Sequence, residues 1–357
     1  MKMFLTNFHY KKQYNPLDAF VFAGLLIPSF VYLGITKIRN YLYKKDILKS
    51  SKPNAYIVSV GNLTTGGTGK TPITAEIAKY FAEQGYKTAI LSRGYGGKLS
   101  NKNVNIISDG ETIFFNPIDS GDEPNWLAQN CKGVYVLTCS SRVKAAEYAY
   151  RELGCARIVL DDGFQHRKLE RDKNILVVDA SKKFSNGCLL PAGALRESVT
   201  EVQRADVIVV TNKSFDDRAA KTYARYLRKT YKKPAVVCSL VPDFVYNLKD
   251  GLPLSDDYKQ NPAVIAFSAI GQPEQFYSLL RRYDIIETVD FPDHHIYTEE
   301  DIQKLFDLKQ KYDADLFITT EKDAVKLKEL KVNLDNFYAL KLKPDLNVEE
   351  IFALGEN

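Results

Sequence analysis

A glycine-rich loop between a short apolar run and a helical pattern is the feature that most constrains this chain. The run Ala55–Val60 is β-branched and aromatic, which predicts a buried strand, and it continues into the loop Gly61–Thr71, GNLTTGGTGKT. Apolar residues then recur at helical spacing until Gly85. Strand, glycine-rich loop, Lys-Thr pair and helix together predict a polyphosphate-binding P-loop.

The residue types of this loop match a bound nucleoside triphosphate. Glycines let backbone N–H groups turn toward phosphates, and the N-terminus of the helix adds positive potential. Thr64 stands where the motif usually has its first glycine, which is possible if its φ is negative. Lys70 is expected to reach the β- and γ-phosphates of ATP, and Thr71 to offer its hydroxyl to Mg²⁺. The predicted nucleotide-binding residues are Thr64, Thr65, Gly66, Gly67, Thr68, Gly69, Lys70 and Thr71.

A second apolar run ends in paired aspartates. The run Arg157–Leu160 is followed directly by Asp161 and Asp162. A P-loop protein holds its metal with a carboxylate at the end of a neighbouring strand, directly or through water. The sequence therefore predicts a Mg²⁺ site formed by Thr71, Asp161 and Asp162, without deciding which aspartate lies closer.

Three further residues are candidates for chemistry at the phosphate. Asp122 precedes a predicted helix at residues 125–130, and it is either a helix N-cap or a general base for an acceptor hydroxyl. Arg196 lies in a loop of small residues, and Arg142 begins a helix headed by Ser141. Either guanidinium can neutralise phosphate charge, although a surface ion pair is the commoner role for each.

Adjacent histidines occur at His294 and His295, before a predicted helix capped by Thr298. Adjacent histidines suggest metal binding, but no further ligand accompanies them at useful spacing. A catalytic or substrate-orienting histidine is the better interpretation.

The stretch Ala19–Ile35 is strongly apolar and has no charged residue, and six basic residues follow it by position 52. Its length is at the lower limit for a membrane span, and a glycine and a proline interrupt it. We weigh an interfacial helix in one leaflet, a spanning helix and a buried core helix. The first is favoured because the basic residues attract anionic lipid.

Composition excludes several classes of protein. The 357 residues are 45% hydrophobic and 26% charged, which is globular and sufficient for two domains. The formal charge of +5 does not by itself indicate nucleic-acid binding, and residues 37–52, with six basic residues and one acidic residue, carry an equal excess. The five cysteines form no C-x-x-C pair, so we expect reduced thiols rather than a disulfide framework.

Apolar runs and helical patterns alternate along the chain, which predicts an α/β fold with a mostly parallel sheet covered on both faces. We expect a membrane-associated segment at 1–52, a P-loop core at 53–233 and a smaller α/β lobe at 234–357. A β-ribbon of residues 235–240 and 244–248 is expected to join the lobe to the core. The other expected strands are 55–60, 87–91, 134–138, 157–161, 174–178, 206–210, 263–267 and 315–320, with a helix at 273–283.

Seven motifs, in order along nearly the whole chain, resemble the tetraacyldisaccharide 4'-kinase family. They are VGNLTTGGTGKTP at 60–72, LSRGYGG at 91–97, GDEP at 121–124, DDGFQH at 161–166, LLPAGALRE at 189–197, FPDHH at 291–295 and TEKDAV at 320–325. The resemblance implies ATP- and Mg²⁺-dependent phosphorylation of the 4'-hydroxyl of tetraacyldisaccharide 1-phosphate, which gives lipid IVA.

The resemblance also implies residue roles and a location. Asp122 matches the family's catalytic base, which works with a histidine matched by His294 rather than His295. The metal aspartates match Asp161 and Asp162, and the loop arginine matches Arg196. The family works at the cytoplasmic face of the inner membrane with an N-terminal helix in the lipid. We expect a monomer that binds the acylated disaccharide and membrane lipid but no nucleic acid.

Two other functions stay open from the residues. One is a P-loop ATPase or GTPase that acts as a switch or metallochaperone, although Thr211–Ser214 lacks the aspartate of a guanine-specifying tetrad. The other is a membrane scaffold that only binds nucleotide. The presence of metal, base and arginine motifs together disfavours it.

Overall fold

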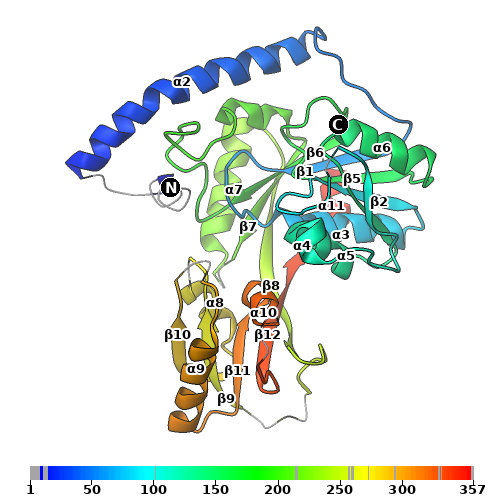
Figure 1. Ribbon diagram of the computed structural model, residues 1–357. Helices are drawn as coiled ribbons and strands as arrows, with labels where there is room; N and C mark the ends of the chain where they lie inside the picture. Colours follow the sequence, from blue (N-terminus) through cyan, green and yellow to red (C-terminus); the bar gives the residue numbers. More distant parts are fainter. Residues whose placement is uncertain are drawn as a thin grey trace. The chain divides into compact units, whose positions relative to one another are not determined.

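The computed structural model shows two compact units (Figure 1). The first contains Met1–Asn212, Arg218–Cys238 and Leu346–Asn357, and the second contains Lys213–Asp217 and Ser239–Asp345. The structure describes residues 9–10, 15–100, 102–213, 216–255, 258, 261–271, 273–292, 295–328, 330 and 332–354.

The first unit is a mostly parallel sheet with strand order β8-β7-β6-β1-β5-β2-β4-β3. Neighbours from β7 to β4 are parallel, and the edge strand β3 is antiparallel to β4. The prediction missed β3, a strand of four residues with partly buried first positions. The strands are β1 Tyr56–Gly61, β2 Thr88–Ser92, β3 Asn105–Ser108, β4 Val134–Thr138, β5 Arg157–Asp161, β6 Lys173–Asp179 and β7 Val207–Asn212, with β8 (Ala235–Asn247) running into the second unit.

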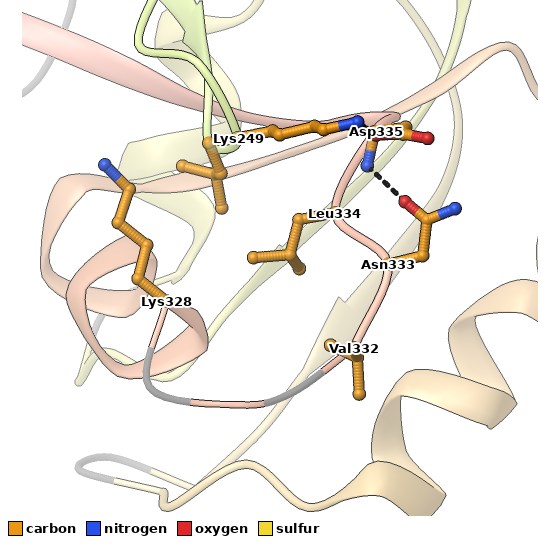
Figure 2. Close-up of a pocket in the computed structure, with 7 residues that line it drawn as sticks. Lys249, Lys328, Val332, Asn333, Leu334 and Asp335 are labelled. Atoms are coloured by element: carbon orange, nitrogen blue, oxygen red, sulfur yellow. Dashed lines mark hydrogen bonds and ion pairs between the residues drawn. The ribbon is translucent and has the colours of Figure 1, made fainter.

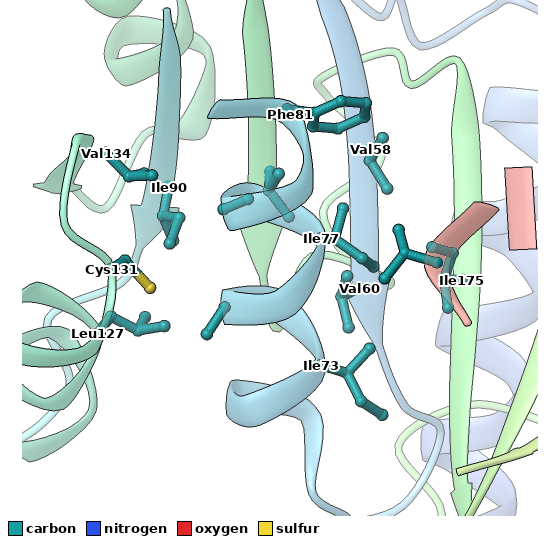
Figure 3. Close-up of a cluster of buried hydrophobic side chains, with 14 of the residues drawn as sticks. Val58, Val60, Ile73, Ile77, Phe81, Ile90, Leu127, Cys131, Val134 and Ile175 are labelled. Atoms are coloured by element: carbon teal, nitrogen blue, oxygen red, sulfur yellow. The ribbon is translucent and has the colours of Figure 1, made fainter. Parts of the chain in front are cut away.

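Both faces of this sheet are buried, as parallel strands require. On one face, Ile73, Ile77 and Phe81 of α3 pack against strand residues that include Val58 and Val60 (Figure 3). Alternate strand residues pack against α6 and α7 in two separate clusters. The helices of this unit are α2 Pro16–Lys44, α3 Lys70–Glu83, α4 Pro117–Ser120, α5 Asp122–Asn130, α6 Arg142–Arg151, the 3₁₀ helix η1 Val199–Arg204, α7 Arg218–Tyr231 and α11 Val348–Ala353.

The C-terminal helix α11 belongs to the first unit, whereas the sequence suggested that the second lobe continues to residue 357. The ring of Phe352 stacks on Tyr80, with centroids 5.9 Å apart, and packs against Phe81 at 5.1 Å. Lys173 donates hydrogen bonds of 2.8 Å to the carbonyls of Phe352 and Leu354. Aromatic packing and these bonds fix α11 on α3 and β6.

The second unit has strand order β10-β9-β11-β12-β8, parallel except for the antiparallel pair of β12 and β8. The fold is therefore the predicted α/β class with mostly parallel strands. The elements are β9 Ala263–Ser268, α8 Pro273–Leu279, β10 Asp284–Asp290, α9 Glu299–Tyr312, β11 Leu316–Thr320, α10 Glu321–Leu327 and β12 Phe337–Asp345. Thr298 caps α9 as expected, with Asp301 completing a capping box.

The β-ribbon is present, but its strands differ from those expected. Residues 235–247 form one strand of 13 residues, β8, and its antiparallel partner is β12. The strand continues through Pro242, which pairs opposite Leu342 next to a register shift of the ladder, where a missing N–H is tolerated.

Helix α2 buries polar side chains and exposes apolar ones, the reverse of a helix in a water-soluble protein. It starts at a capping box formed by Asn15 and Asp18, and continues through Pro28. Its buried residues are polar: Asp18, Ser29, Thr36 and Asn40. Its exposed side chains include Leu17 at 72%, Phe20 at 79% and Ile27 at 72%.

Among the described residues, α2 is the one helix long and apolar enough to cross a membrane, with a mean hydropathy of 2.0 over its most apolar window. Only 11% of that window is buried. This exposure does not agree with a buried core helix, one of the three interpretations of the sequence. It fits a helix whose outer face lies in lipid.

Candidate active site

The P-loop connects β1 to α3 and has the conformation expected of a phosphate cradle. Gly66 and Gly69 have φ values of +100° and +82°, which strongly favour glycine. A Cβ added at Gly66 or Gly67 would meet no atom within 4 Å, so the space beside these two glycines is open. Thr64 has a negative φ, which meets the condition for its presence in place of glycine.

Hydrogen bonds from three segments hold this loop in place. Asn62 donates to the Thr68 hydroxyl at 3.1 Å, and the Thr211 hydroxyl donates to the Thr68 carbonyl at 2.8 Å. The backbone N–H of Thr65 donates to the Ala194 carbonyl at 2.8 Å. The loop is therefore fixed by β7 and by the 189–197 motif before any ligand binds.

Lys70 begins α3 and points toward the paired aspartates. Its Nζ lies 3.7 Å from Oδ1 of Asp162, and Arg196 Nη1 donates to both oxygens of the same carboxylate at 2.9 and 2.7 Å. Burial alone would raise the pKa of Asp162. The charges of Lys70 and Arg196 outweigh it and hold the pKa below its usual value, so this carboxylate is ionised at neutral pH.

Asp161, at the end of β5, is 2% exposed and accepts a hydrogen bond of 3.2 Å from the Thr74 hydroxyl. Burial, followed by the negative charge of Glu123, raises its pKa to about 7. Glu123 was not predicted from the sequence as a residue of the site, although its position directly after the candidate base Asp122 could have indicated it. The two adjacent aspartates thus have opposite pKa shifts, because Asp162 has nearby cations and Asp161 is deeper.

Arg142, the first residue of α6, is buried rather than on the surface. It donates to the carbonyl of Cys139 at 2.9 Å and to the carbonyl of Asp161 at 3.1 Å. Burial lowers its pKa to about 10, so the guanidinium stays charged at neutral pH. The surface ion pair considered for this arginine is excluded, and its charge lies next to the paired aspartates.

Asp122 is the first residue of α5, and Gly121, with φ of +92°, is the N-cap. The structure therefore does not support the N-cap interpretation of Asp122, whose side chain is exposed. Two glycines allow the turn before α5 to approach the loop after β2. A Cβ on Gly97 would lie 2.4 Å from the carbonyl oxygen of Asp119, and one on Gly121 would lie 2.7 Å from that of Tyr95.

Of the two histidines singled out in the sequence, His294 lies outside the described residues, and His295 belongs to the second unit. His295 is bound to the capping residue Asp301, with Nε2 2.8 Å from its carboxylate, and its ring stacks on Phe291. Lys326, which directly follows the TEKDAV motif, donates to the His295 carbonyl at 3.0 Å. The backbone and the ring of His295 are thus both fixed by structural contacts.

Comparison with known proteins gives a consistent result. The family model of tetraacyldisaccharide-1-P 4'-kinase matches residues 22–354. The chain belongs to this family. The tetraacyldisaccharide 4'-kinases of Syntrophus aciditrophicus and Geobacter metallireducens are 37% and 36% identical to it, over 87% and 92% of this chain and 86% and 96% of theirs. A crystal structure of LpxK from Aquifex aeolicus in complex with ATP is 32% identical, with a TM-score of 0.68, covering 93% of this chain and 97% of that one.

As a member of this family, the chain is an ATP-binding lipid kinase of lipid A biosynthesis. The resemblance stated from the seven motifs is confirmed. The interpretations as a GTPase switch, a metallochaperone or a non-catalytic scaffold are set aside on the same evidence.

The donor atoms of this kinase fit Mg²⁺. No group of three or more His, Cys, Asp or Glu side chains is arranged as a metal site in the described part of the chain. Mg²⁺ does not need one, because it keeps several waters and takes one or two carboxylates with substrate phosphates. Asp161 and Asp162 supply two adjacent carboxylates at the end of β5, the kind of oxygen donor that Mg²⁺ takes.

A surface pocket of this kinase lies within the second unit (Figure 2). It is lined by Leu248, Lys249, Lys328, Val332, Asn333, Leu334 and Asp335. Lys249 and Asp335 form an exposed ion pair of 2.7 Å at its edge. None of the predicted site residues lines this pocket, so it adds nothing to the assignment of the reaction.

Proposed function

We propose that this kinase transfers the γ-phosphoryl group of ATP to the 4'-hydroxyl of tetraacyldisaccharide 1-phosphate at the cytoplasmic face of the inner membrane. Mg²⁺ assists the reaction, and the chain works as a monomer. The observation that carries the proposal is the approach of Lys70 and Arg196 to Asp162, next to an open P-loop.

The nucleotide is bound by residues Thr64–Thr71. Backbone N–H groups of the loop face the phosphates, and the N-terminus of α3 adds positive potential. Lys70 is 9% exposed and moves from Asp162 to the β- and γ-phosphates, since a triphosphate offers it more negative charge than one carboxylate.

Asp161 and Asp162, with the Thr71 hydroxyl, hold the metal. A bound Mg²⁺ would supply positive charge against the phosphates during the transfer. Asp162 is ionised at neutral pH, and a bound cation would favour the ionised form of Asp161 as well, because a cation lowers the pKa of a nearby carboxyl.

Asp122 is the general base. Its carboxylate accepts the proton of the 4'-hydroxyl as that oxygen attacks the γ-phosphorus, and the bond from this phosphorus to the β–γ bridging oxygen breaks to release ADP. Its exposure at the first turn of α5 leaves it accessible to an acceptor, and the neighbouring Glu123 is close enough to Asp161 to affect its pKa. His294 is the proposed partner of Asp122, since the ring of His295 is already bound to Asp301.

Arg196 and Arg142 stabilise the negative charge of the transferred group. Arg196 is partly exposed and directly bound to Asp162, so it can turn to phosphate without breaking the fold. Arg142 contributes its charge from a buried position behind β5 and fixes the backbone of Asp161.

Helix α2 brings the site to its lipid substrate. Its apolar side chains face outward while Ser29 donates a hydrogen bond of 2.8 Å to the carbonyl of Leu189 in the site motif 189–197. An interfacial position of α2 places this motif near the headgroup level, where the disaccharide of an acylated lipid lies.

The deciding experiment follows labelled γ-phosphate from ATP in the presence of the disaccharide 1-phosphate in mixed micelles. Label should appear in the lipid, depend on both Mg²⁺ and lipid, and be lost in Lys70→Ala. Label that appears only as inorganic phosphate, whether or not lipid is present, would contradict the proposal and favour an ATPase.

A further inference from the structure

Glu197 is a buried carboxylate that the reaction does not use directly. It follows Arg196 in the chain and is 0% exposed. Arg39 and Arg204 both form ion pairs with it, and Asn40 donates to its Oε1 at 3.1 Å. A buried carboxylate is costly unless charge and hydrogen bonds compensate it, and here two guanidinium groups and an amide do so.

Two of these partners come from α2. Arg39 and Asn40 lie in its last turns, on the side that faces the protein, and Asn40 is itself buried. The carbonyl of Asn40 also accepts a hydrogen bond of 3.1 Å from Arg167, which follows the DDGFQH motif. The end of α2 is therefore bonded to both motif loops of the site.

The other contacts of Glu197 lead to the phosphate-binding residues. Nε2 of Gln165 donates to the carbonyl of Asn62 at 2.7 Å and lies 3.5 Å from Oε2 of Glu197. Oε1 of Gln165 lies 3.5 Å from Nη1 of Arg196. Arg204 donates to the carbonyl of Phe164 at 3.2 Å and lies over its ring. Glu197 thus joins the loop that carries Arg196 to the loop that carries Asp162.

We propose that Glu197 is a positioning residue that fixes Arg196 against Asp162, and that Arg39 and Asn40 make this position depend on how α2 is seated. The inference rests on the proposed roles of Arg196 and Asp162. Because α2 carries the proposed lipid-facing surface, Arg196 holds its position against Asp162 only when α2 is packed against the protein.

Arg39→Met is the first test, because it removes one ion pair at a residue whose side chain is 37% exposed and leaves Glu197 with Arg204 and Asn40. We expect kcat with the lipid substrate to fall about tenfold. The KM for ATP and the melting temperature should change little. The matched control is Arg151→Met, which breaks an exposed ion pair with Glu147 on α6. It should stay within twofold of wild type in all three measurements.

Glu197→Gln is the second test, and it should lower kcat more than Arg39→Met does. In the double variant, the loss should equal that of Glu197→Gln alone, because Arg39 acts through Glu197. Independent, multiplicative losses would overturn the inference. So would a fall in activity that only follows the fraction of unfolded protein. A failure of the proposed function appears differently, as wild-type protein that does not phosphorylate the lipid.

Discussion

The active site and helix α2 both reverse the usual distribution of side chains, in opposite directions. Around the P-loop, charged groups are inside: Lys70 is 9% exposed, Arg142 3% and Asp161 2%. On α2, large apolar groups are outside, and polar ones are turned to the protein. Each arrangement costs free energy in water, so each marks a place where another molecule completes the structure.

The difference between the two regions lies in what completes them. Buried charges around a glycine loop are balanced by ions of opposite sign, which are the phosphates of ATP and, in our proposal, a metal. Exposed apolar side chains beside the basic residues 37–52 are compatible with a lipid surface, which our proposal assigns to them. Variants in one region should therefore affect catalysis or lipid attachment separately, and the predictions below test this separation.

Lys70→Ala should have the largest effect. It removes the one side-chain cation of the P-loop itself, so ATP binding should weaken and turnover fall by at least about 10³-fold. Labelled phosphate transfer and equilibrium binding of ATP measure the two losses, and binding to lipid vesicles should be unchanged. Lys79→Ala, which breaks a partly exposed ion pair with Glu76 on the same helix, is the control. Equal losses in both variants would contradict the role of Lys70.

Asp122→Ala should lower turnover by about 10²–10⁴-fold, the range for loss of a general base, while ATP still binds. The side chain is exposed at the start of α5, so stability should change little. Glu299→Ala is the matched control, since it removes an exposed first-turn carboxylate from α9. An Asp122→Ala enzyme with near-normal turnover would remove the proposed base from the mechanism.

Phe20→Glu combined with Ile27→Glu should detach the protein from lipid and spare nucleotide binding. Burial of each side chain in the interface contributes about 1.5–3 kcal/mol, so vesicle association should fall by about 10²-fold or more. Flotation with anionic vesicles measures this loss of association. Tyr226→Glu alters another exposed aromatic residue, 54% exposed on α7, and should leave association unchanged. If both changes weaken binding equally, α2 is not the specific membrane contact.

The parts of the molecule that the sequence predicted are those encoded locally. The P-loop, the paired aspartates and the core strands each follow from residue patterns within about ten positions, and the structure has them where expected. The caps at Ser141 and Thr298 were found for the same reason. These features depend on backbone preferences and hydrophobic periodicity, which a single sequence contains.

The features that were missed depend on contacts between distant residues. Glu197 and Arg39 are 158 positions apart, and no local pattern pairs them. The burial of Arg142 depends on the carbonyl of Asp161 in a neighbouring strand, and the placement of α11 depends on Phe352 meeting Tyr80. The apolar content of α2 was visible in the sequence, but the polar stripe that attaches it to the protein was not, because its partners come from the 189–197 motif.

The smallest predicted effect is a pH dependence of stability that arises inside the site region. His166 has a buried Nε2 with no hydrogen-bond partner in the part of the chain that the structure describes. Burial, followed by the charges of Arg142 and Arg171, lowers its pKa to about 4. The folded chain therefore favours neutral His166, and the unfolded chain takes up a proton first as the pH falls.

The contribution of His166 is fully present above the unfolded pKa of about 6.5 and is lost as the pH falls from there to about 4. Because the ring is partly exposed, solvent screening limits the loss to on the order of 1–2 kcal/mol. Urea unfolding of the metal-free and nucleotide-free protein at pH 5 and 7.5 measures it, and His166→Gln should reduce the difference between the two values. If wild type and His166→Gln lose stability equally on acidification, the pH dependence comes from other groups. The folded chain would then tolerate protonated His166 beside Arg142 and Arg171 even when no ligand is bound.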